Sequence, residues 1–113
     1  MVSVDTIMPK VEIARLMAGT RFLIETEGGV WSLKLKNPKR LEVEVVGTDP
    51  RFASKPAPVL GVFVESCDPA TKHGSPGEII KGQSFSVRFR DVVLVSQPIT
   101  SVLIEGPGWS YEL

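Results

Sequence analysis

Residues 21–36 read RFLIETEGGVWSLKLK, and this stretch decides the fold of the chain. Apolar and polar residues alternate on both sides of a glycine pair, as in two half-buried strands joined by a tight turn. Adjacent glycines suit such a turn because they adopt positive φ without steric cost. A two-residue turn at Gly28 and Gly29 sets three cross-strand pairs: Thr26 with Trp31, Ile24 with Leu33, and Phe22 with Leu35. All six residues then lie on one face, and we predict a hairpin of strands 21–26 and 30–36.

The next strand is predicted at residues 41–46, after a turn at Asn37-Pro38-Lys39. Its apolar residues alternate with two glutamates, so its apolar face can join that of the preceding strand. Lys34 and Lys36 then share the opposite face with Glu42 and Glu44. Opposite charges are favoured across neighbouring strands, so we expect a solvent-exposed face with lysine–glutamate pairs.

The rest of the chain continues as short strands separated by Gly and Pro. They are expected at 59–65, 79–80, 84–90, 92–95, 99–104 and 109–113, with loops at 47–58 and 66–77. Segment 59–65 is apolar nearly throughout, which is compatible with burial on both faces. Regularly spaced short strands indicate an all-β, mainly antiparallel domain spanning 1–113. We predict a small, partly open β-barrel over 21–113, with a β-sandwich as the alternative.

One segment breaks the strand pattern. Pro9 suits the first position of a helix, and Gly19 suits the residue that follows its end. Ile13, Leu16 and Met17 have the spacing of one apolar helical stripe. We therefore predict one short N-terminal helix over 9–18, packed on the sheet.

Composition argues against several functions. The 113 residues carry 13 Lys and Arg against 13 Asp and Glu, so the formal net charge is zero. A nucleic-acid-binding chain needs an excess of positive charge on its contact face, so single-stranded nucleic acid is a partner that the net charge does not support. No apolar run approaches the length of a membrane helix, and the first residues do not resemble a signal peptide. With Cys67 as the only cysteine, the expectation is a soluble cytoplasmic protein without disulfides.

Two groups of residues are candidates for binding. Arg88 and Arg90 are two apart on a predicted strand, so both guanidinium groups can face one phosphate or carboxylate. Trp109 and Tyr111 alternate in the last five residues and could stack bases beside these arginines. The simpler interpretation of the arginines is that they lie on the solvent-exposed outer face of the sheet. The simpler interpretation of Trp109 and Tyr111 is a closing strand that buries both rings in the core. If the rings do not fill their own core, we expect them to fill a groove on a second copy of the chain.

The two long loops hold the remaining candidates, Arg51 and His73. Cys67 and His73 resemble a nucleophile with its base, or two zinc ligands, but a zinc site needs three or four ligands. We therefore predict no catalytic residue, no metal and no cofactor, and favour a non-enzymatic binding or interaction module. A protein partner or self-association fits best, without a membrane. The alternative is a small enzyme or ligand-binding barrel with a pocket between loops 47–58 and 66–77.

Overall fold

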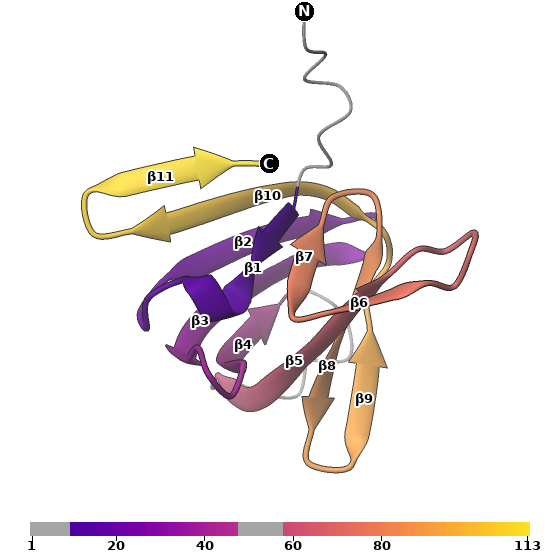
Figure 1. Ribbon diagram of the computed structural model, residues 1–113, viewed down its shortest axis with the longest axis horizontal. Helices are drawn as coiled ribbons and strands as arrows, with labels where there is room; N and C mark the ends of the chain where they lie inside the picture. Colours follow the sequence, from indigo (N-terminus) through magenta and orange to yellow (C-terminus); the bar gives the residue numbers. More distant parts are fainter. Residues whose placement is uncertain (1–9, 48–57) are drawn as a thin grey trace, which may run out of the picture.

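The computed structural model describes residues 10–47 and 58–113. Within them the chain is mostly antiparallel β-structure, as the alternating pattern predicts (Figure 1). The strands are β1 (Lys10–Glu12), β2 (Arg21–Thr26), β3 (Gly29–Asn37), β4 (Glu42–Gly47), β5 (Val59–Cys67), β6 (Gly74–Pro76), β7 (Glu78–Ile80), β8 (Ser84–Phe89), β9 (Val92–Val95), β10 (Ile99–Gly106) and β11 (Trp109–Glu112). A single 3-10 turn, η2 (Ile13–Arg15), follows β1.

Nine of these strands form one curved sheet in the order β11-β10-β2-β3-β4-β5-β8-β9, with β6 paired to β5. Strands β1 and β7 form a separate pair that lies against the sheet (Figure 1). The sheet is not closed into a barrel, which corrects the barrel prediction. Backbone bonds join Ile99 to Gly82 and Gln83 at one end, but the β8–β9 and β10–β11 hairpins diverge from there. Among the described strands, β9 and β11 therefore remain the two ends of the sheet.

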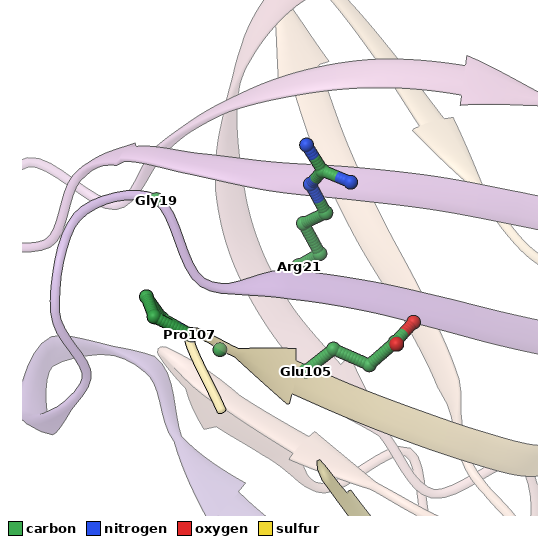
Figure 2. Close-up of a pocket in the computed structure, with 5 residues that line it drawn as sticks. Gly19, Arg21, Glu105 and Pro107 are labelled. Carbon is green, nitrogen blue, oxygen red and sulfur yellow. The ribbon is translucent and has the colours of Figure 1, made fainter. Parts of the chain in front are cut away.

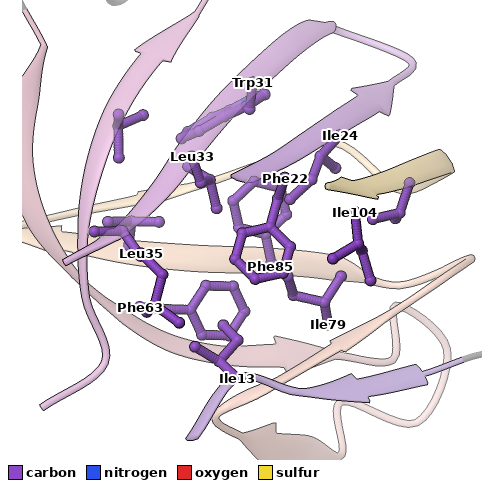
Figure 3. Close-up of a cluster of buried hydrophobic side chains, with 14 of the residues drawn as sticks. Ile13, Phe22, Ile24, Trp31, Leu33, Leu35, Phe63, Ile79, Phe85 and Ile104 are labelled. Atoms are coloured by element: carbon purple, nitrogen blue, oxygen red, sulfur yellow. The ribbon is translucent and has the colours of Figure 1, made fainter. Parts of the chain in front are cut away.

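The inner face of the sheet carries the core that the strand alternation predicts (Figure 3). Its fully buried side chains include Phe22, Ile24, Trp31, Leu33, Leu35, Val43, Val45, Phe63, Phe85 and Val87. Phe85 contacts two other rings: Trp31 edge-on at 4.9 Å between centroids and Phe63 in a stack at 5.8 Å. Strand β5 is buried on one face only, since Leu60 on its other face is 54% exposed. The expectation of burial on both faces is therefore wrong.

The first hairpin has the predicted faces but a different turn. Glu27 and Gly28 form the turn, and Thr26 pairs with Gly29, so Ile24 faces Trp31 rather than Leu33. The Thr26 hydroxyl holds this turn, because its Oγ1 donates to the Gly29 carbonyl at 2.8 Å and accepts from the Gly28 N–H at 3.1 Å. The register shift is two residues, and an even shift leaves every side chain on its predicted face.

The charged face between β3 and β4 also agrees with prediction. Lys34 lies opposite Glu44, and Leu35 opposite Val43 on the buried side. Lys36 Nζ lies 3.1 Å from Glu44 Oε1, with both side chains partly exposed. The lysine–glutamate pairing thus forms on the outer face, diagonally across the two strands.

The predicted helix over 9–18 is wrong, because residues 10–15 form β1 followed by the one-turn η2. Residues Lys10–Glu12 pair with β7, and Leu16 is already extended at φ −96° and ψ 159°. A helix of ten residues is marginal alone, so strand pairing and burial of Ile13 override the helical spacing. Met17, expected on the apolar stripe, is 82% exposed. No helix among the described residues has the length and apolarity to cross a membrane.

Candidate functional site

The C-terminal hairpin, β10 and β11, is the most distinctive exposed feature of the described chain. Its two-residue turn is Pro107-Gly108, and Gly108 has a φ of +75°. Proline followed by a residue of positive φ is the composition of a type II turn. The turn sends β11 back beside β10, with Glu105 opposite Ser110 and Leu103 opposite Glu112. The strand predicted at 109–113 is therefore confirmed as β11.

The backbone groups of β11 point alternately toward β10 and away from it. Leu113 donates its N–H to the Val102 carbonyl at 3.0 Å, so Leu113 belongs to a hydrogen-bonded pair. Residues two apart on an antiparallel strand point the same way, so Trp109 and Tyr111 also direct their backbone groups at β10. Ser110 and Glu112 then direct their N–H and C=O groups to the other side. That side is an end of the sheet in the described structure.

The two aromatic side chains of β11 lie on the inner face of the sheet but are not buried. Tyr111 is opposite the buried Ile104, and Trp109 is opposite Gly106. The rings are 61% and 44% exposed respectively. The prediction that this strand buries both rings in the core is therefore wrong. The reason is geometric, since the hairpin projects past the body of the sheet and only Leu113 reaches the core (Figure 1).

The Trp109 indole is nevertheless held in place. It lies over the Cα of Gly106, in the space that a side chain at position 106 would fill. An aromatic ring packed over a glycine on the neighbouring strand is a known way of stabilising a sheet edge. The ring is thus fixed on one side and open to solvent on the other.

A shallow pocket of about 300 Å³ lies beside the hairpin turn (Figure 2). Arg21 of β2 and Glu105 of β10 are cross-strand neighbours that line it, together with Gly19, Gly106 and Pro107. Figure 2 shows both charged side chains extending from adjacent strands. The pocket therefore offers one cation and one anion beside the β10–β11 turn.

Arg88 and Arg90 line one hollow, although Arg90 lies in the turn after β8 and not on the predicted strand 84–90. Arg88 lies on the outer face of β8, and Arg90 begins the β8–β9 turn with a φ of +58°. Both line a hollow of about 180 Å³ with Leu60, Gly61 and Val62, and the Glu42 side chain lines it too. A carboxylate in the same hollow repels an incoming anion, which weakens the case for an anion site.

The structure separates these arginines from the aromatic residues. Arg88 is on the outer face of β8, whereas Trp109 and Tyr111 are on the inner face of β11, at the far end of the strand order. The arrangement in which bases stack on the rings beside the arginines is not present. A continuous single-stranded nucleic-acid surface from these four residues therefore has no geometric support.

The remaining predicted residues do not form a site. His73 is exposed in the turn between β5 and β6, where its carbonyl accepts the Asp68 N–H at 2.9 Å. Cys67 is half-buried at the end of β5. Within residues 10–47 and 58–113, no three His, Cys, Asp or Glu side chains are grouped as metal ligands would be. Arg51 and most of loop 47–58 lie outside the described residues, and with them the predicted pocket between the two loops.

Sequence reasoning identified Trp109 and Tyr111 but missed the backbone groups beside them. The side chains of Ser110 and Glu112 are ordinary for a strand and carry no binding signal. The signal was present in the turn instead, because a two-residue turn at Pro107-Gly108 determines which residues of β11 point outward. Comparisons with protein-family models, curated proteins and solved structures find no match to this chain.

Proposed function

We propose that this chain is a protein-interaction module that binds an extended segment of a partner at the free edge of β11. The observation that carries the proposal is the outward direction of the Ser110 and Glu112 backbone groups beside exposed Trp109 and Tyr111. Adding a strand to a sheet edge is a recurrent mode of peptide recognition. Main-chain hydrogen bonds provide the affinity, and alternate side chains provide the specificity.

Each part of the edge has a role in this mode. The N–H and C=O groups of Ser110 and Glu112 pair with the backbone of the incoming strand. Trp109 and Tyr111 provide an apolar surface for its inner-facing side chains, and such rings are frequent anchors in protein interfaces. Arg21 and Glu105 lie near the turn, where they select for charge at one end of the bound segment.

An exposed edge of this kind is otherwise a liability. Natural sheets protect edge strands with charges, proline or bulges, because an unprotected edge pairs with other chains. Strand β11 carries one charged residue, Glu112, and two large exposed rings. The edge is therefore better explained as a binding surface than as an unused end. The half-buried free thiol of Cys67 fits the cytoplasmic location that we propose with this function.

A displayed library of short random peptides tests the proposal directly. Peptides selected on the wild-type domain should bind a Ser110→Pro variant about tenfold more weakly, since the Ser110 N–H hydrogen bond is lost at the edge and the proline ring obstructs the incoming strand. The proline leaves the β10–β11 bonds intact, because the Ser110 N–H points away from β10. Val93→Pro is the matched control on the other end strand and should leave binding unchanged.

Two results would contradict the proposal. One is a set of selected peptides whose binding survives Ser110→Pro. The other is binding that is lost with Arg88→Ala or Arg90→Ala, which would move the site to the outer hollow lined by these residues. Circular dichroism of each variant separates loss of binding from loss of fold.

A further inference from the structure

We propose that the segment bound at this edge is β11 of a second copy, in an antiparallel pair with Tyr111 on the two-fold axis. This inference rests on the proposed function and names its partner. A two-fold contact is isologous, meaning that the same surface of each copy contacts the other. The edge of β11 must therefore be complementary to itself, and both its backbone and its side chains satisfy this condition.

The backbone favours this register. Hydrogen bonds between two copies require that outward-directed residues face each other, and these are Ser110 and Glu112. With Tyr111 on the axis, Ser110 faces the partner's Glu112 at two symmetric places. Each hydrogen-bonded pair in an antiparallel ladder exchanges two bonds, so this register forms four. With the axis at Ser110, the only hydrogen-bonded pair within the strand is Ser110 with the partner's Ser110, which gives two bonds instead of four.

The side chains favour the same register. A two-fold axis perpendicular to the sheet keeps inner faces together, so Trp109 lies across from the partner's Leu113 and Tyr111 lies across from the partner's Tyr111. On the outer face, Ser110 lies across from the partner's Glu112. An axis at Glu112 would instead place two carboxylates directly opposite each other, which is destabilising. The register centred on Tyr111 therefore combines one apolar row and no like-charged pair directly opposite with the larger number of backbone hydrogen bonds.

The other end strand is a poorer partner for this edge. Val93 and Val95 of β9 are exposed on the outer face, beside Arg88 and Ser86 respectively. An antiparallel contact between β9 and the partner's β11 would place these valines beside the partner's Ser110 and the partner's Glu112, both polar, on the outer face. Such a contact is also head-to-tail, so it generates rings or open chains of molecules rather than a two-fold dimer.

Cysteine cross-linking tests the register in a Cys67→Ser background. Residues that face each other without hydrogen bonds have Cα atoms about 4.5 Å apart, within the range for a disulfide. Tyr111→Cys should therefore form a covalent dimer under mild oxidation. Ser110→Cys is the matched control and should cross-link much less, because its counterpart lies diagonally away. Equal cross-linking, or faster cross-linking of Ser110→Cys, would overturn the register.

Charge variants at Ser110 test the pairing while leaving Trp109 and Tyr111 in place. Ser110→Lys faces the partner's Glu112 and should strengthen the dimer at low salt, whereas Ser110→Glu should weaken it. With the axis at Ser110, both substitutions would weaken it, because each would face its own copy. Weakening by Ser110→Lys in a folded protein would therefore refute the proposal.

Mass measurement in solution supplies the final criterion. Because the paired strands are short, we expect a weak dimer whose mass approaches 24.6 kDa, twice the 12.3 kDa chain, only at high concentration. A monomer at every concentration, with peptides still selected in a Ser110-dependent way, would overturn self-pairing but leave the proposed function standing. If neither a dimer nor Ser110-dependent peptides are found, self-pairing and the proposed function are both overturned. Open polymers abolished by Val93→Pro would instead identify the head-to-tail contact.

Discussion

Replacing Phe85 by Ala should destabilise the fold more than almost any other single change. Phe85 is fully buried and its ring contacts both Trp31 and Phe63. Truncating a buried Phe to Ala costs about 3–5 kcal/mol in free energy of unfolding. We expect the upper part of this range, because aromatic pairs contribute beyond the area they bury. Domains of this size unfold with a free energy of about 5–15 kcal/mol, so the variant should lose a large share of its stability.

Urea unfolding followed by circular dichroism measures the effect. With a slope of about 2 kcal/mol per molar urea, a loss of about 4 kcal/mol lowers the midpoint by about 2 M. Leu60→Ala is the control, because Leu60 is apolar but lies exposed on the outer face of β5. Its midpoint should move by less than about 0.5 M, since surface substitutions usually change stability by about 0.5 kcal/mol or less. If Phe85→Ala and Leu60→Ala unfold at the same urea concentration, the assignment of the core is wrong.

Four further outcomes are expected. Lys36→Glu should lower the free energy of unfolding by less than about 1 kcal/mol, and by less still at high salt, because its ion pair with Glu44 is partly exposed; a larger loss in urea unfolding would contradict this. Gly61→Ala should cost about 1–3 kcal/mol by the same assay, since the added Cβ would lie 2.8 Å from the Phe89 ring; unchanged stability would show that the ring moves freely. A strong chelator should leave the thermal midpoint unchanged, and a drop of several degrees would reveal a structural metal. Deletion of 109–113 should lower the melting temperature or convert a dimer to monomer, whereas unchanged temperature and mass would show that this strand is dispensable.

The sequence by itself determined which side chains share a face. Alternation along a strand is local, because successive side chains point to opposite sides of any sheet. The local pattern alone therefore predicts that Phe22 and Ile24 are buried on one side of the sheet and that Lys36 is solvent-exposed on the other. Even the incorrect turn in the first hairpin left these faces unchanged, since the error in register was even.

Only the tertiary structure decided what covers each face. Residues 9–18 have helical spacing, yet pairing of β1 with β7 and burial of Ile13 determine the conformation of residues 10–15. Trp109 and Tyr111 have the alternation of a core strand, yet their hairpin projects beyond the core and leaves them exposed. Alternation reports the direction of a side chain, whereas burial and binding depend on elements distant in sequence. The candidate site at β11 follows from both, because a local turn directs its backbone outward and the open sheet leaves that edge as an end.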